Sequence, residues 1–162
     1  MGMPISLTAT VDAPRERVFD FICDLSKRPA WTDHFMSDFR LARIEPSGQG
    51  AGARFRVGAP RVTLADTTIA EASRPHRVTE VGHGGRLNRI TLRTVWELTE
   101  GPGAVTTVNL SFWTEPAGRG ARWWRRRWKK ALRRLSAAIE SGEPVPEEIV
   151  VAGGNRQLTG IA

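Results

Sequence analysis

Few cysteines, few histidines and no long apolar run set the first limits on this chain of 162 residues. Cys23 stands alone, which excludes an internal disulfide and a zinc site with four cysteine ligands. His34, His76 and His83 are widely separated, and none has a helical i, i+4 partner or a neighbouring cysteine. The sequence therefore predicts no metal site.

No apolar stretch approaches the roughly 18 residues that a helix needs to cross a bilayer. Residues 1–11 alternate apolar and polar side chains and lack the charged-then-apolar pattern of a secretory signal. Hydrophobic residues make up 40% and charged residues 25% of the chain, which is ordinary for a globular protein. We therefore expect a cytoplasmic protein that buries one core of its own.

A glycine-rich segment at Gly48, Gly50 and Gly52 superficially matches a phosphate-binding loop. Such a loop requires a helix after it, because the N-terminus of that helix holds the anion. Phe55 and Val57 alternate with polar residues, so the element that follows is predicted to be a strand. We interpret the segment as a hairpin, and the sequence predicts no cofactor.

Apolar and polar residues alternating with a period of two predict a strand at Ile5–Val11 and a meander of strands after it. Leu92 and Trp96 belong to the clearest of these strands. Between Leu64 and Ile69 the apolar phase changes, which predicts a bulge or bend. The predicted strands of the meander are Phe39–Glu45, Ala53–Ala59, Val62–Ala72, Arg77–Gly82, Asn88–Thr99 and Ala104–Thr114.

Helical spacing of apolar residues occurs in three places. Asp12 is predicted to cap a first helix that has Pro14 in its first turn, and a short second piece follows at 31–35. A long helix is predicted at 119–140, with Gly142 ending it. At about 100° per residue, its apolar side chains fall within an arc of about 120°, and most of its cations lie on the opposite side.

One strand, two short helical pieces, six strands and a long helix predict an α+β fold in which one helix crosses one sheet. The stretch from Val11 to Phe21 resembles the opening of the START-like, or SRPBCC, superfamily. Trp31, the entry to a strand at 50–55 and the hairpin at 74–78 are similar to that superfamily at the corresponding places. The resemblance covers about residues 4–141.

The resemblance implies the helix-grip fold: a curved antiparallel sheet of about seven strands wrapped around a long C-terminal helix, with two short helices after the first strand. It divides the chain into a ligand-binding domain at 1–142 and a tail at 143–162. The superfamily includes lipid-transfer START domains and bacterial polyketide cyclase/dehydratase-like proteins. In such relatives a cavity between helix and sheet holds an apolar or amphipathic small molecule.

Two functions of that cavity follow as hypotheses. The first is a carrier or sensor of a hydrophobic small molecule, lipid-like or polyketide-like, and the second is an enzyme of the polyketide cyclase/dehydratase type. Whether the chain is an enzyme stays open, with His34 as the one weak candidate for acid/base chemistry. Core packing is the alternative role of the residues expected to line the cavity, which are Trp31, Phe35, Phe55, Leu92, Trp96, Leu110, Phe112, Trp124, Trp128 and Leu132.

The positive charge of the chain is concentrated in the predicted long helix. The whole chain carries +7, and the segment from Arg119 to Glu140 holds nine basic residues and one acidic residue. An exposed, solvated face is one interpretation, and contact with an anionic membrane or an acidic protein is another. Nucleic acid is disfavoured because the chain lacks a groove-reading module. The proposed contacts are Arg126, Lys129, Lys130 and Arg133, in a monomer or homodimer.

Overall fold

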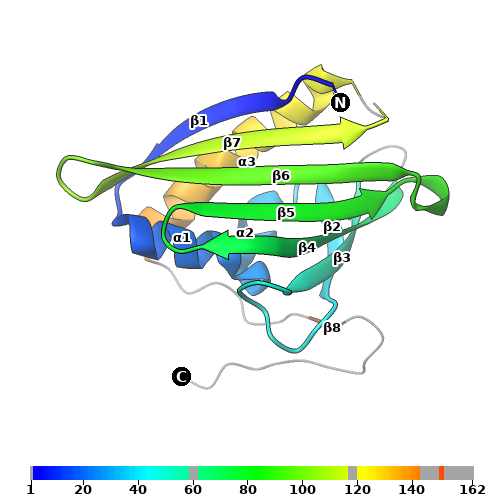
Figure 1. Cartoon of the computed structure of the whole chain (residues 1–162), viewed down its shortest axis with the longest axis horizontal. Coiled ribbons are helices and arrows are strands. Elements are labelled where there is room, and N and C mark those ends of the chain that lie inside the picture. The colour runs from blue at the N-terminus through cyan, green and yellow to red at the C-terminus, as the bar shows by residue number, and fades with distance from the viewer. Residues whose placement is uncertain (1, 59–61, 117–119, 143–149, 152–162) are drawn as a thin grey trace.

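The computed structural model describes residues 2–58, 62–116, 120–142 and 150–151 (Figure 1). Seven antiparallel strands form one sheet in the order β1-β7-β6-β5-β4-β3-β2, and a short eighth strand pairs in parallel with β2. The strands are β1 (Ile5–Val11), β2 (Met36–Leu41), β3 (Gly52–Val57), β4 (Thr63–Ser73), β5 (Arg77–Gly84), β6 (Ile90–Gly101), β7 (Val105–Glu115) and β8 (Val150–Val151). The helices are α1 (Arg15–Cys23), α2 (Pro29–Thr32) and α3 (Ala121–Ser141), with the 3-10 helices η1 (Leu25–Lys27) and η2 (Arg86–Asn88).

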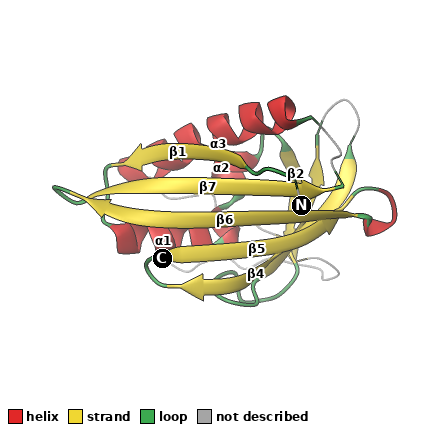
Figure 2. Cartoon of the chain, turned by 45° about the horizontal axis from the view of Figure 1, so that its top comes forward, coloured by secondary structure: helices red, strands yellow, loops and turns green. Residues whose placement is uncertain are grey.

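The α-helices lie on one face of the curved sheet, and within the described ranges no helix covers the other face (Figures 1 and 2). α3 packs against β1 and α2 along its length. The predicted α+β helix-grip architecture is confirmed, including the short helices after the first strand. No helix in the described part of the chain is long and apolar enough to span a membrane.

β7 shows how alternation in the sequence produces a sheet with two different faces. Thr106, Val108, Leu110 and Phe112 are buried, whereas the residues between them are partly exposed. β7 pairs with β1 on one side and β6 on the other. The hydroxyl of Thr106 also donates a hydrogen bond of 2.8 Å to the carbonyl oxygen of Ala13, which fixes the chain entering α1 against the sheet.

The start of the meander differs from the sequence-based expectation. β2 begins at Met36, three residues before the predicted Phe39, because the strand continues through an irregular segment. Asp38 there has a φ of 49°, and the register against β3 shifts between Ser37 and Arg40. A strand prediction based on alternating apolar and polar residues fails across such a shift, because the side chains after it point to the opposite faces of the sheet.

The irregularity predicted in β4 lies further along the strand. Leu64 is 61% exposed on the outer face, whereas Ala65, Thr67 and Ile69 are buried in regular alternation. The register against β5 shifts after Ile69, before Glu71. The apparent change of phase in the sequence therefore reflects an exposed leucine, and the bulge follows it.

The first helix is entered differently from the prediction, and the long helix ends as predicted. Pro14, not Asp12, occupies the N-cap position of α1, and no side chain caps that helix. The backbone N–H of Asp12 instead donates to Oε1 of Glu140 near the end of α3, at 2.9 Å. α3 ends at Gly142, which adopts a left-handed φ of 62°. The predicted start of this helix at Arg119, the strand end at Ala59 and most of the predicted tail lie outside the described residues.

Gly82 allows β4 and β5 to approach each other closely. A Cβ atom at this position would lie 1.8 Å from the carbonyl oxygen of Asp66 and 3.0 Å from the Cα atom of Thr67. Both atoms belong to the backbone, so no side-chain rotation can relieve the overlap.

Replacing Gly82 with alanine should therefore lower the free energy of unfolding by at least ~2 kcal/mol, because β4 must shift to make room. Urea unfolding followed by circular dichroism measures this loss. Gly120→Ala is the matched control, since a Cβ atom there has nothing within 4 Å and the loss should stay below ~1 kcal/mol. Equal losses in the two variants would contradict the close approach.

Candidate ligand-binding site

Aromatic side chains fill the space between α3 and the concave face of the sheet. The ring of Trp128 on α3 lies 5.7 Å from that of Trp96 on β6 and 5.5 Å from that of Phe112 on β7. Phe35, just before β2, approaches Trp128 from the other side at 5.2 Å. Trp124, one turn earlier on α3, lies 4.6 Å from Phe112. These tilted and edge-to-face contacts anchor the helix on the sheet.

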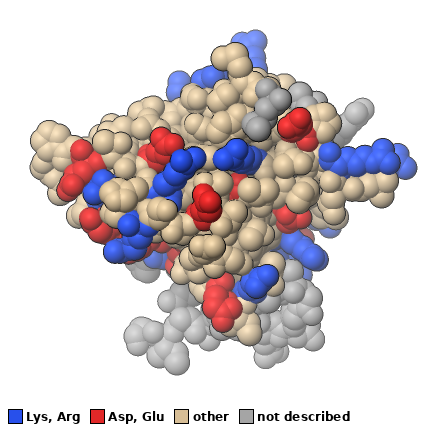
Figure 3. Space-filling view, viewed as in Figure 1, with Lys and Arg blue, Asp and Glu red and all other residues tan. Residues whose placement is uncertain are grey.

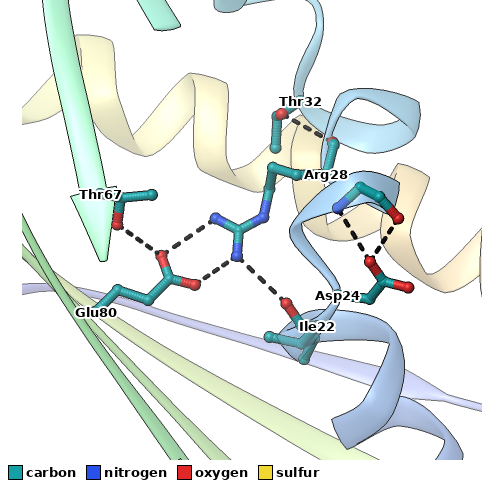
Figure 4. Close-up of polar contacts among 7 residues, drawn as sticks. Ile22, Asp24, Arg28, Thr32, Thr67 and Glu80 are labelled. Carbon is teal, nitrogen blue, oxygen red and sulfur yellow. Dashed lines mark hydrogen bonds and ion pairs between the residues drawn. The ribbon is translucent and has the colours of Figure 1, made fainter. Parts of the chain in front are cut away.

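A charged pair is buried beside this aromatic cluster (Figure 4). The side chains of Arg28 and Glu80 are 1% and 2% exposed, and the guanidinium group meets the carboxylate through two nitrogen–oxygen contacts. Thr67 donates a further hydrogen bond of 3.4 Å to the carboxylate, and the carbonyl oxygen of Ile22 accepts one of 3.4 Å from the guanidinium. The guanidinium carbon lies 4.8 Å from the centre of the Trp31 ring. The arginine is thus held by charge, hydrogen bonds and an aromatic face.

A small cavity separates the charged pair from the aromatic rings of α3. Its volume is about 20 Å³, which is room for about one water molecule. Its walls combine an ion pair and hydroxyl groups with apolar side chains, so it is amphipathic. The lining residues are Arg28, Met36, Phe55, Asp66, Thr67, Glu80, Leu92, Thr94, Phe112, Trp124 and Trp128.

Several buried indole groups around this cavity have an unused hydrogen-bond donor. The ring N–H groups of Trp124 and Trp128, which line the cavity, have no partner among the described residues. The same holds for Trp31 and Trp96, which lie in the same aromatic cluster. Buried donors without acceptors are rare in folded proteins, because each costs free energy when it leaves water. Two of these four indoles, Trp124 and Trp128, belong to residues that line the cavity.

The structure brings together all the residues that the sequence nominated for the ligand, but only some of them reach the cavity. Phe55, Leu92, Phe112, Trp124 and Trp128 line it. The others are buried in the surrounding core, namely Trp31, Phe35, Trp96, Leu110 and Leu132.

Sequence reasoning missed the polar half of the lining. Glu80 occupies an inward position of β5, two residues after the buried Val78, and this register was the available signal. Arg28 precedes Pro29 in a segment without regular periodicity, so nothing in the sequence indicated its burial. Thr67 and Thr94 are inward-facing residues of strands, where hydroxyl-bearing and apolar side chains are hard to distinguish by pattern.

His34 lies outside the cavity, between the end of α2 and α3. Its Nε2 atom is 3.0 Å from the carbonyl oxygen of Arg127, and its Nδ1 atom is 3.0 Å from a guanidinium nitrogen of Arg134. A carbonyl only accepts and a guanidinium only donates, so the ring is neutral with its proton on Nε2. Burial, followed by the nearby charges of Arg134 and Lys130, lowers the pKa of His34. Both ring nitrogens are thus hydrogen-bonded to α3, and His34 is not among the residues that line the cavity.

Cys23 is buried at the end of α1. Burial, and secondarily the negative charge of Glu80, raises the pKa of its thiol to about 12. A thiol with so high a pKa forms little of the nucleophilic thiolate near neutral pH. No group of three or more metal-ligating side chains occurs within the described ranges.

Glu80→Gln should destabilise the protein by ~3–5 kcal/mol, because it leaves the guanidinium charge of Arg28 buried without a counter-charge. Arg28→Met should destabilise the protein by a similar amount, because it leaves the carboxylate charge of Glu80 buried without a counter-charge. The double variant should lose clearly less than the sum of the two, since neither charge then remains. Urea unfolding of the four proteins measures this coupling, and strict additivity would show that the pair does not act as a unit.

Stability should fall as the pH drops below about 6.5, the ordinary pKa of histidine, because the unfolded chain then binds a proton that folded His34 resists. The contribution is fully present above that pH and is lost towards the lower pKa of the folded state. His34→Gln keeps a donor and an acceptor but does not titrate. Urea midpoints at about pH 7.5 and 5.5 should therefore differ less in this variant than in the wild type, and an unchanged difference would exclude His34 as the cause.

The chain matches a family model described as "Polyketide cyclase / dehydrase and lipid transport" over residues 4–140. A search of curated proteins returned no match. Similar solved structures share the fold at low sequence identity, which carries no information on chemistry.

The solution structure of the KanY protein is similar with a TM-score of 0.69 and 19% identity, over 86% of this chain and 99% of that chain. Protein CV1439 from Chromobacterium violaceum is similar with a TM-score of 0.68 and 15% identity, also over 86% and 99%. The di-domain ARO/CYC StfQ from the steffimycin biosynthetic pathway gives a TM-score of 0.66 and 15% identity, over 85% of this chain and 45% of that chain. With nearly its whole helix-grip domain matched by the family model, the chain belongs to the polyketide cyclase/dehydrase and lipid transport family of the START-like (SRPBCC) superfamily.

Proposed function

We propose that this protein binds an amphipathic small molecule between α3 and the sheet, as a carrier or sensor. The ligand we infer has an apolar, polycyclic skeleton that bears several oxygen acceptors. The observation that carries this proposal is that Trp124 and Trp128, whose indole N–H groups have no partner among the described residues, line a cavity that is also lined by a buried ion pair.

The polar lining favours an oxygenated ligand over a plain acyl chain. An acyl chain presents acceptors only at its carboxyl end, whereas the unpartnered donors of the lining residues belong to two tryptophans of α3 and to Nε of Arg28. A skeleton with carbonyl or hydroxyl groups along its length can accept hydrogen bonds from several of them, which removes the cost of leaving them unpaired. The apolar walls contributed by Phe55, Leu92 and Phe112 then bury the rest of the ligand.

Binding of such a molecule requires the cavity to enlarge. A volume of about 20 Å³ is far below the roughly 300–1,000 Å³ of ordinary small-molecule sites. The aromatic contacts between α3 and the sheet must therefore rearrange, and Trp124 and Phe112 are the rings placed to move, since both line the cavity near the start of α3 and the end of β7. Binding should consequently change the tryptophan fluorescence.

The family supports this class of ligand, because its description joins polyketide cyclases and dehydrases with lipid transport. Two similar structures belong to proteins of biosynthetic pathways: the di-domain ARO/CYC StfQ from the steffimycin biosynthetic pathway, and DynU16, a protein in the dynemicin biosynthetic locus. These assignments concern the other proteins, and they support the proposal only in that the same fold occurs in biosynthetic pathways.

An enzyme of the cyclase/dehydratase type is a second candidate, favoured by the charged pair in the cavity wall. The carboxylate of Glu80 could remove a proton from a carbon between two carbonyl groups, and the guanidinium of Arg28 could stabilise the resulting enolate. The enolate carbon would then attack another carbonyl group further along the same molecule, and the oxygen of that carbonyl would take up the proton. Loss of water would complete an aromatic ring.

A matched pair of tricyclic compounds tests the preference for oxygen acceptors. We expect 1,8-dihydroxyanthraquinone to quench the tryptophan fluorescence and to bind at least about tenfold more tightly than anthracene, which has the same skeleton without oxygens. Equal affinities would contradict the role of the donors, and the absence of binding by either compound would contradict the proposed ligand class.

Blocking the cavity should abolish this binding. Leu92→Trp replaces an aliphatic lining side chain with a bulkier indole that fills the cavity, and it should weaken binding of 1,8-dihydroxyanthraquinone at least about tenfold. Leu64→Trp makes the same exchange on the exposed face and should leave the affinity unchanged. Similar effects of the two substitutions would place the ligand elsewhere.

Mass spectrometry separates a carrier from an enzyme. A carrier returns a poly-β-ketone model substrate unchanged, whereas a cyclase/dehydratase yields a product that has lost water. In the second case Glu80→Gln should stop turnover, and binding measured by fluorescence on the folded variant should remain.

A further inference from the structure

Five cations form a continuous stripe on the exposed side of α3. They are spaced at i, i+4, i+7, i+8 and i+11 along the helix, and each is exposed. None takes part in an ion pair or side-chain hydrogen bond with another part of the described chain. We call this set the α3 cationic stripe, which consists of Arg122, Arg126, Lys129, Lys130 and Arg133.

Two other basic residues of α3 differ from the stripe because their side chains have hydrogen-bond or ion-pair partners. Arg125 donates to the carbonyl oxygen of Ser6 at 3.3 Å, and Arg134 contacts the carboxylate of Asp33 and the carbonyl oxygen of Ala30. These arginines fix α3 to its neighbours. The stripe has no such structural role.

The α3 cationic stripe makes the helix less stable than a neutral face would. Arg122–Arg126 and Arg126–Lys130 are like-charge pairs at i, i+4, and Lys129–Arg133 is a third, each of which weakens a helix. Arg122 also places a cation in the first turn, where the helix dipole favours an anion, and no acidic residue lies there. Folding therefore does not account for the stripe.

An open groove is lined by four of the five residues of the stripe. Its volume is about 580 Å³, and its lining contains no acidic residue within the described ranges. Trp123 lies in it with the guanidinium carbon of Arg127 at 5.2 Å from its ring. The lining residues are Gly120, Arg122, Trp123, Arg126, Arg127, Lys130 and Arg133.

The opposite face of the molecule has a different charge pattern. Figure 3 looks onto the uncovered face of the sheet, where acidic and basic side chains are interspersed. Ion pairs such as Arg56–Asp38 and Arg74–Asp20 neutralise part of the charge in other regions. The excess of positive charge therefore lies on the exposed side of α3.

From this arrangement we propose that the α3 cationic stripe docks the protein on an anionic lipid bilayer. A protein partner would require a desolvated, apolar centre in the interface, and the groove offers only Trp123 among its cations. Nucleic acid is disfavoured because the chain lacks a groove-reading module. A bilayer surface requires neither an apolar interface centre nor a groove-reading module, because each cation near anionic headgroups adds binding free energy on its own.

Docking through the stripe would bring the ligand cavity close to the bilayer. Trp124 and Trp128 lie on the same turns of α3 as Arg126 and Lys129, but on the side that lines the cavity. One helix would then contact lipid on its outer side and cover the cavity on its inner side. The docking proposal itself depends only on the stripe and holds whether or not the cavity binds a ligand.

Vesicle flotation with two charge-matched variants tests the proposal. The stripe variant combines Arg126→Glu, Lys130→Glu and Arg133→Glu. The control variant makes the same change at three other exposed arginines without partners in the described structure, Arg43, Arg86 and Arg89, so both variants have the same net charge. Circular dichroism verifies that each variant is folded, and a stripe variant with glutamine in place of glutamate serves if it is not.

The wild type and the control variant should float with vesicles of phosphatidylcholine and phosphatidylglycerol at low salt, and not with phosphatidylcholine alone. The stripe variant should bind at least about 100-fold more weakly, since each cation contributes about a factor of five. Binding should also weaken as salt shortens the screening length. Equal loss in both variants, no binding by the wild type, or binding only to a nucleic acid or acidic protein would overturn the proposal. Fluorescence with 1,8-dihydroxyanthraquinone on the stripe variant reports the cavity separately.

Discussion

The packing of the α3 tryptophans on the concave face of the sheet is the contact on which the rest of the structure depends. Trp128 touches rings from β6, β7 and the segment before β2, so one side chain joins parts of the chain that are far apart in sequence. This contact orients α3, and the orientation fixes both of its other properties. It places Trp124 over the cavity, and it leaves the α3 cationic stripe facing solvent.

The buried Arg28–Glu80 pair lines the same cavity as the α3 tryptophans Trp124 and Trp128. Replacing a buried ion pair with apolar residues commonly costs little stability, so its presence points towards recognition or chemistry more than towards folding. The pair stands opposite indole donors that have no partner among the described residues. An interior with an ion pair and unused donors is poorly matched to a purely structural core and well matched to an oxygen-bearing guest.

Sequence patterns predicted the fold well because its main elements have clean periodicity. β7 alternates without interruption, and α3 separates the buried Trp124 and Trp128 from most of its cations. The polar part of the site was harder to predict, because Arg28 lies in an irregular segment and Glu80 is revealed only by the register of β5. Hydrogen-bond satisfaction, on which the argument for Trp124 and Trp128 depends, is set by three-dimensional neighbours and leaves no trace in sequence spacing. Likewise, the two partners of His34 on α3 lie 93 and 100 residues further along the chain, so local sequence spacing does not indicate them.

The indole N–H resonances of the protein offer the most direct test of the central claim, that these donors bind an oxygenated ligand. The chain has six tryptophans, and Trp113 on the outer face of β7 provides an internal reference. In ¹H–¹⁵N spectra, titration with 1,8-dihydroxyanthraquinone should shift the Trp124 and Trp128 indole signals and leave Trp113 in place. Shifts confined to Trp113, or no shift at saturating ligand, would contradict the account.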